Sequence, residues 1–146
     1  MRLIRLFSGQ LFLLCGVFVA FLSLAFVGAA GQFPFDRGLL LDAAPMRPGK
    51  RMPILAVAPD GKATIDLWCK SVTAQVELSD AGIKIEPGPL PEALPEMMGN
   101  GQCTPERMQA DQDLLTAFTQ VTSWRSQGST LVLEGPTKLK FRPASN

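Results

Sequence analysis

The chain has 146 residues, with 14 Lys and Arg against 13 Asp and Glu and a formal net charge of +1, and it contains no His. This length allows one small domain. The lack of His excludes Ser-His-Asp and Cys-His catalytic groups and His-ligated zinc sites, because these need an imidazole that titrates or coordinates near neutral pH. The nearly balanced charge offers no electrostatic footprint for nucleic acid, so we expect no nucleic-acid partner.

An apolar run near the N-terminus predicts export. Arg2 and Arg5 precede the run at 11–27, and small residues follow at 28–31. This order is typical of a signal peptide. The run is also long enough to span a bilayer, so residues 1–30 form either a cleaved signal peptide or a retained signal anchor. In both cases the positive-inside tendency places the rest of the chain in the periplasm, free or held at the inner membrane.

The exported part begins with a Pro-rich stretch and continues as strands. Residues 31–53 contain four Pro and are interpreted as a linker with one short strand at 38–42. Beyond it, alternating apolar and polar residues between turn sequences such as Pro59-Asp60-Gly61 indicate strands. These strands are expected at 54–58, 63–69, 72–78 and 83–85. Neighbouring strands of this kind should form an antiparallel meander.

A helix and a closing group of strands follow a second Pro-rich stretch. Residues 86–102 are expected to form a surface connection, because four Pro and three Gly leave no periodic pattern. Thr104-Pro105-Glu106 is typical of a helix start, since Thr can cap a free N–H and Pro fits the first helical position. The apolar stripe expected to pack on the sheet comprises Met108, Leu114, Leu115, Phe118 and Val121.

Further strands are predicted at 122–126, 130–134 and 137–142. Strands on both sides of one helix predict an α+β fold, in which an antiparallel sheet of about six to seven strands packs against a single α-helix. The domain itself is expected to cover residues 54–142.

Residues 60–142 resemble the META domain, or HslJ-like, family, most closely over 97–141. The similar features are a Met-rich approach to Cys103, a capped helix with an acidic residue in its second turn, an aromatic strand, and a closing hairpin of Leu-x-Leu and Leu-x-Phe type. The resemblance implies a small exported or membrane-associated bacterial protein, linked in name to heat shock, and no established catalytic residues. One departure is Trp68-Cys69-Lys70, where the family usually has Gly-Cys-Asn.

Cys69 and Cys103 are the two Cys that lie beyond the N-terminal segment. An even number of Cys in an oxidising compartment predicts a disulfide. The alternative is two separate buried thiols, because Cys packs well as a small hydrophobe. Two thiolates without His or a third Cys cannot complete a tetrahedral set, so we expect neither a metal nor a cofactor.

Four other residues are candidates for a structural or binding role. Asp111 falls inside the apolar stripe of the predicted helix, where an unpaired carboxylate would be costly, so it should be a structural acid bonded to backbone or to an Arg. Arg107, four residues earlier, is the candidate Arg. Trp68 and Trp124 are the candidate binding surface for a carbohydrate or a partner, and the alternative is that both pack within strands.

Three functional hypotheses remain, and we expect a monomer in each. The first is a non-catalytic envelope module that binds a protein, lipid or glycan, or that supports the envelope under stress. The second is a periplasmic inhibitor or assembly partner of a secreted enzyme or envelope machine, with residues 86–102 inserting into its target. The third is a hydrolase, which requires two carboxylates to converge in a concave pocket, chosen from Asp60, Asp66 and Glu77.

Overall fold

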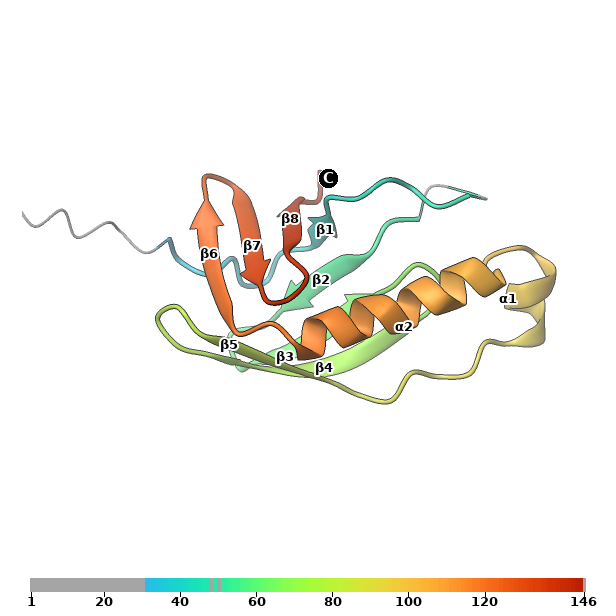
Figure 1. The fold of residues 1–146 in the computed structure, drawn as a ribbon, viewed down its shortest axis with the longest axis horizontal. Coiled ribbons are helices and arrows are strands. Elements are labelled where there is room, and N and C mark those ends of the chain that lie inside the picture. The colour runs from blue at the N-terminus through green and yellow to red at the C-terminus, as the bar shows by residue number, and fades with distance from the viewer. Residues whose placement is uncertain (1–30, 48, 50, 146) are drawn as a thin grey trace, which may run out of the picture.

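The described residues form one antiparallel sheet and two helices in the computed structural model, which describes residues 31–47, 49 and 51–145 (Figure 1). The predicted signal or anchor at 1–30 lies outside the described residues. The elements are β1 (Leu39–Leu41), β2 (Ile54–Val57), β3 (Lys62–Asp66), β4 (Ser71–Leu78), β5 (Ile83–Pro87), α1 (Pro95–Gly99), α2 (Pro105–Thr119), β6 (Ser123–Gln127), β7 (Thr130–Glu134) and β8 (Leu139–Pro143).

The predicted antiparallel sheet with a packed helix is confirmed, but the sheet in this part of the chain has eight strands rather than six to seven. Its order is β5-β4-β3-β2-β1-β8-β7-β6. The difference comes from β1, the short strand of the Pro-rich stretch, which lies in the middle of the sheet. It pairs with β2 through Leu39 and Leu55, and with β8 through Leu41 and Phe141, so it joins the meander to the C-terminal strands.

The two outer strands of the sheet meet, so that the sheet nearly closes into a barrel (Figure 1). An isolated bridge pairs Gly82 with Ser123. On either side of it, the Ile83 N–H donates to the Thr122 carbonyl at 3.2 Å, and the Trp124 N–H donates to the Ala81 carbonyl at 2.9 Å. The remaining length of β5 lies against α2, which therefore covers the opening between β5 and β6.

The core lies inside this barrel and under α2. Inward-facing side chains alternate along the strands, as in the burial pattern of β3, where Ala63 and Ile65 are buried and Lys62 and Thr64 are exposed. Phe118 of α2 reaches the interior and stacks on Phe141 of β8, with ring centroids 5.9 Å apart. Both rings are fully buried. The predicted packing of the helix on the sheet is thereby confirmed.

The helix start is also as predicted, but the buried side of α2 is rotated. Thr104 is the N-cap, and its hydroxyl accepts a hydrogen bond from the Arg107 N–H at 3.3 Å. Met108 and Leu115 are only partly buried. The buried helix residues are Arg107, Asp111, Leu114, Ala117 and Phe118. Two polar side chains therefore occupy the buried side of the first two turns, and their partners lie in other elements.

Residues 88–102 form a surface connection, as expected, whereas Glu86 and Pro87 of the predicted connection belong to β5 and pair with β4. They include the short helix α1, which exposes the large hydrophobic side chains Leu94 and Met98 just before and within it. The Cys103 N–H donates to the Met97 carbonyl at 2.8 Å, which ties α1 to the start of α2. Neither α1 nor α2, the helices of the described ranges, is long and apolar enough to cross a membrane.

Candidate functional site

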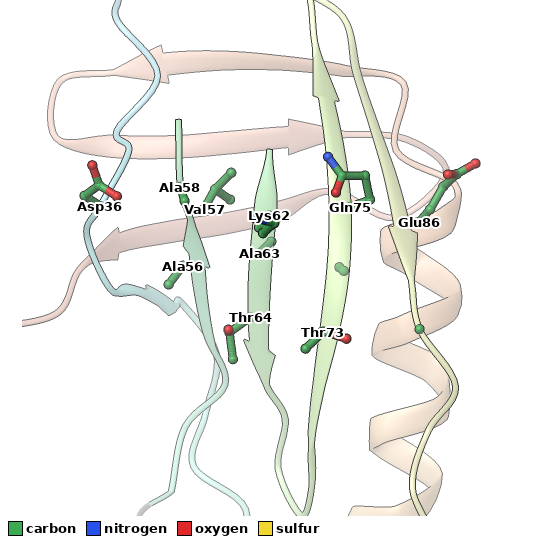
Figure 2. A pocket seen from close by; sticks show the side chains of 12 residues that line it. Asp36, Ala56, Val57, Ala58, Lys62, Ala63, Thr64, Thr73, Gln75 and Glu86 are labelled. Atoms are coloured by element: carbon green, nitrogen blue, oxygen red, sulfur yellow. The ribbon is translucent and has the colours of Figure 1, made fainter. Parts of the chain in front are cut away.

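A hollow of about 660 Å³ lies on the outer face of β2, β3, β4 and β5 (Figure 2). Strand register explains it, because outward positions of neighbouring strands fall in rows across the sheet. One row contains only small residues: Ala56 lies opposite Thr64, Thr64 lies opposite Thr73, and Gly88 donates its N–H to the Thr73 carbonyl at 2.8 Å. We call this row of small residues, with the hollow above it, the trough.

Longer polar side chains border the trough on one side. Lys62 lies opposite Gln75, and Gln75 lies opposite Glu86, which makes the adjacent outward row. Lys62 pairs with Asp60 at 2.9 Å, and Lys84 pairs with Glu86 at 2.6 Å. These pairs are exposed and add little stability, but they neutralise Lys62 and Glu86, the two charged residues of this row.

Asp36 stands at the β2 end of the trough (Figure 2). It is the non-glycine residue of the described ranges with a positive φ, 56°. Asp adopts this left-handed conformation more readily than most residues, because its short side chain can form hydrogen bonds with nearby backbone groups. The Asp36 N–H donates to the Val57 carbonyl at 2.9 Å, which holds the turn against β2 and leaves the carboxylate exposed.

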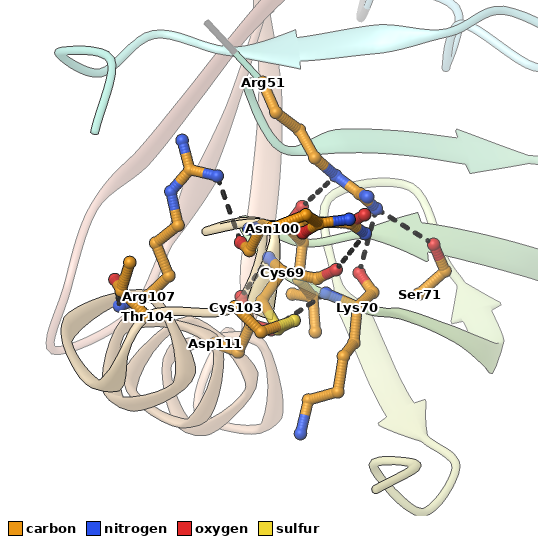
Figure 3. Close-up of a disulfide and its surroundings, with 11 residues drawn as sticks. Arg51, Cys69, Lys70, Ser71, Asn100, Cys103, Thr104, Arg107 and Asp111 are labelled. Carbon is orange, nitrogen blue, oxygen red and sulfur yellow. Dashed lines mark hydrogen bonds between the residues drawn. A yellow bond between two sulfur atoms is a disulfide. The ribbon is translucent and has the colours of Figure 1, made fainter. Parts of the chain in front are cut away.

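A disulfide joins the turn between β3 and β4 to the start of α2 (Figure 3). Cys69 and Cys103 are bonded, with Cα atoms 4.9 Å apart and a sequence separation of 34. Their exposed fractions are 0% and 2%. The predicted disulfide is confirmed, and the alternative of two separate thiols does not hold.

Asp111 lies beside the disulfide and binds the same turn. Its two carboxylate oxygens accept hydrogen bonds from the Cys69 N–H at 3.1 Å and from the Lys70 N–H at 3.0 Å. Burial raises the pKa of Asp111 above its ordinary value, and the N–H donors oppose that rise. Of the two expected partners, backbone is the one observed. Arg107 instead donates to the Gln102 carbonyl at 3.1 Å and to the Met46 carbonyl at 2.6 Å.

The carbonyl groups of this turn are bound from the other side. Arg51 donates from Nε to the Leu67 carbonyl at 2.9 Å, and from its terminal nitrogen to the Lys70 carbonyl at 3.3 Å. Gln102 donates to the Cys69 carbonyl at 3.2 Å. These contacts hold three segments together, namely Arg51, the turn at 67–70, and residues 102–111. We call this cluster the clasp. Its chemistry is that of a structural anchor.

The structure does not bring the two Trp residues together. Trp68 belongs to the turn before β4 and is 6% exposed. Trp124 bonds to Ala81, beyond the far end of β4, so about 25 Å of strand separates the two. The partly buried Trp124 ring packs edge-on against Phe33 at 5.2 Å, and its Nε1 donates to the Ser79 carbonyl at 3.2 Å. A binding role for these residues stays a prediction.

The candidate acid–base carboxylates also lie apart. Asp66 pairs with Ser71 at the start of β4, while Glu77 lies near the other end of that strand. Asp60 lies in the turn before β3, where a hydrogen bond from Lys62 lowers the pKa of its carboxyl. None of the three lines the trough. Among the described residues, no group of three or more Cys, Asp or Glu is arranged to hold a metal ion.

Comparison with protein families matches residues 39–145 to the META domain. The chain belongs to the META domain family. No curated protein and no solved structure gives a significant match. Within this META domain lie the clasp residues and the small-residue row of the trough, whereas Asp36 and Phe33 precede the matched region.

Sequence reasoning missed the trough. Ala56, Thr64, Thr73 and Gly88 are each unremarkable on a solvent-facing strand or at its end, and only their alignment makes a hollow. The available signal was the run of small residues at outward positions, where exposed strands usually carry long polar side chains. To recognise this signal one must know the register in which β2, β3, β4 and β5 pair, and that register depends on the geometry of the turns between them.

Proposed function

We propose that this chain is a non-catalytic exported envelope protein whose META domain binds another molecule. The observation that carries the proposal is the buried disulfide between Cys69 and Cys103. Disulfides form and persist in oxidising compartments such as the periplasm and are rare in the cytosol. The apolar segment at 11–27, preceded by two Arg, supplies a route to that compartment and, if retained, an attachment to the inner membrane.

The arrangement of carboxylates supports a non-catalytic role. A pair of acid–base carboxylates must converge on one substrate. Asp66 ends β3 opposite the first residue of β4, whereas Glu77 lies near the last residue of β4, and Asp60 is engaged with Lys62. The buried carboxylate of Asp111 is occupied by two backbone N–H groups. These acids therefore have structural or surface roles in the proposed function.

A reporter that is active only in the cytoplasm, fused after Asn146, tests the exported location. The full-length fusion should be inactive, and the matched fusion that lacks residues 1–30 should be active, because the second has no export segment. Strong activity of the full-length fusion would overturn the proposed location.

A second candidate function, an inhibitor or assembly partner of another envelope protein, is favoured by a specific observation. Leu94, the N-cap residue of α1, and Met98, one turn later, have exposed fractions of 54% and 48%, and the Met98 N–H donates to the Leu94 carbonyl at 3.3 Å. Two adjacent exposed hydrophobic side chains on a tethered helix suit insertion into a pocket of a partner protein.

Affinity capture from envelope extract distinguishes this second candidate. The wild-type protein should retain one protein that the double variant Leu94→Ser, Met98→Ser fails to retain. The matched double variant Glu92→Ser, Glu96→Ser changes two exposed residues in and just before the same helix and should behave like wild type. Equal retention by all three proteins would exclude α1 as the docking element.

A further inference from the structure

We propose that the outer side of β6–β8 docks on the anionic headgroups of the bilayer to which the N-terminal apolar segment attaches. This proposal rests on the proposed function and assigns the bound partner to one class, a phospholipid surface. Four exposed cations lie on this side of the sheet. We call them the basic face: Arg125 of β6, Lys138 just before β8, and Lys140 and Arg142 of β8.

Strand alternation and register bring these cations together. In β8, the residues that face the core alternate with the exposed Lys140 and Arg142, and Lys138 precedes them at the same spacing. Lys140 lies opposite Val132. Val132 lies opposite Arg125, so Arg125 and Lys140 share one outward row, about 10 Å apart. The basic face therefore spans three neighbouring strands.

Fewer acids than cations lie on this side of the sheet. Glu134 pairs with both Arg125 at 3.1 Å and Lys138 at 3.6 Å, so one carboxylate serves two cations. A second acid, Asp42, donates its N–H to the Lys140 carbonyl at 2.8 Å and has an exposed side chain. The ion pairs of the described residues do not include the two cations of β8. The basic face therefore keeps a positive charge that a partner can neutralise.

The charges of the domain are segregated, although their total is nearly balanced. Residues 123–145 contain four Lys or Arg and one acid, whereas residues 54–122 contain ten Asp or Glu and four Lys or Arg. An anionic surface attracts the first segment and repels the second. An anionic bilayer would therefore orient the domain with β6–β8 toward the headgroups and with the meander and α2 away from them.

The chain enters the domain beside the basic face. Gly31 packs so closely on Ser126 of β6 that a Cβ at residue 31 would overlap the Ser126 side chain (Figure 1). The apolar run ends at residue 27, and the four residues from there to Gly31 can span at most about 14 Å. Another exposed cation, Arg37, lines a hollow at this entry together with Ser126 and Ser129. A retained apolar segment would thus hold β6 at the bilayer surface.

A bilayer that is already attached to the chain suits a face of this modest charge. Each Lys or Arg close to an anionic membrane strengthens binding by only about fivefold. The apolar segment makes docking an intramolecular step with a high effective concentration of lipid, so a weak attraction is sufficient. A soluble acidic polymer would have to bind the same few cations without this attachment. The observations therefore favour the lipid surface.

Lysine acetylation of the full-length protein in lipid nanodiscs tests the proposal. A neutral acetylating reagent modifies exposed lysines, and mass spectrometry measures the rate at each one. Nanodiscs of phosphatidylcholine are compared with nanodiscs that contain about 30% phosphatidylglycerol. We expect Lys138 and Lys140 to react at least about threefold more slowly in the anionic nanodiscs, and this protection to disappear at about 1 M salt. Lys84, on β5, should react at the same rate in both lipids.

The double variant Arg125→Glu, Arg142→Glu keeps both reporter lysines and should lose their protection. The matched variant Lys62→Glu, Lys84→Glu makes the same change of charge at exposed positions of the meander and should keep it.

Three outcomes of the acetylation experiment would overturn the proposal. They are equal rates at the reporter lysines in both lipids, equal protection in wild type and in the basic-face variant, and equal slowing of Lys84. Stronger protection by soluble polyglutamate in neutral nanodiscs than by anionic lipid would also overturn it, since an acidic polymer would then be the partner. The reporter fusions test export separately, so the failure of either idea is recognisable.

Discussion

The Cys69 N–H donates a hydrogen bond of 3.1 Å to the carboxylate of Asp111, at the point where the Cys69 side chain is bonded to Cys103. The turn between β3 and β4 is thus attached to α2 twice, once covalently and once through a buried acid. Each attachment brings together segments that are far apart in sequence. The packing of α2 over the opening between β5 and β6 depends on both.

Replacing Asp111 with Ala should destabilise the domain by about 2–6 kcal/mol. The change leaves the N–H groups of Cys69 and Lys70 without their acceptor, and each unsatisfied buried donor costs about 1–3 kcal/mol. Urea unfolding measures the loss. The control, Asp113→Ala, removes an exposed acid of the same helix and should change stability by less than about 0.5 kcal/mol. Equal stability of wild type and Asp111→Ala would show that the acid is not an anchor.

The stability of the wild-type protein relative to Asp111→Asn should fall as the pH rises. Burial raises the pKa of Asp111 from its ordinary value of 3.8, so the folded state binds this proton more tightly than the unfolded state. The contribution of the group is therefore most favourable below 3.8 and declines as the pH rises through the raised pKa, above which it is constant. Urea unfolding of both proteins between about pH 3 and about pH 8 measures the difference. If the stability of wild type relative to Asp111→Asn rises with pH instead, the N–H donors lower the pKa of Asp111 by more than burial raises it.

The disulfide should contribute about 3–4 kcal/mol, the chain-entropy value for a loop of about 35 residues. The double variant Cys69→Ala, Cys103→Ala should therefore unfold at a lower urea concentration than the oxidised wild type. Reducing agent, once it has opened the bond, should lower the wild-type midpoint and leave that of the double variant unchanged. If the oxidised wild type and the double variant unfold at the same urea concentration, the disulfide does not stabilise the domain.

Phe33 should be essential for stability although it precedes the region matched to the META domain. Its ring is 5% exposed and packs against Trp124. Phe33→Ala should cost about 3–5 kcal/mol, the range for truncation of a buried Phe. Phe35→Ala, at a partly buried ring two residues later, should cost less. Thermal unfolding orders the two variants, and the reverse order would contradict the place of Phe33 in the core.

Local patterns were enough to predict most of the elements. Alternation along β3 and β4 identified strands that are buried on one face, and Thr104-Pro105-Glu106 identified the first turn of α2. The position of β1 in the middle of the sheet was not predictable. Its three Leu residues show no alternation, and its two partners both follow it in sequence, β2 shortly after it and β8 at the far end of the domain.

The candidate sites were less predictable than the fold, for two physical reasons. The buried side of α2 includes Arg107 and Asp111, whose polar groups are satisfied by backbone atoms of distant segments, and a hydrophobic pattern cannot show such partners. The trough depends on register, since Thr64 and Thr73 become neighbours only when β3 and β4 pair. Trp68, chosen as an aromatic surface residue, is buried because its turn is held down by the clasp.

Non-reducing peptide mapping of the full-length protein, purified from producing cells after alkylation of free thiols, tests the central claim most directly. The claim is that this META domain is exported and folds around a buried disulfide. We predict one linked pair of peptides that contain Cys69 and Cys103, with neither Cys alkylated. Alkylation of both Cys69 and Cys103 in the protein from intact cells would contradict both the exported location and the structural role of the clasp.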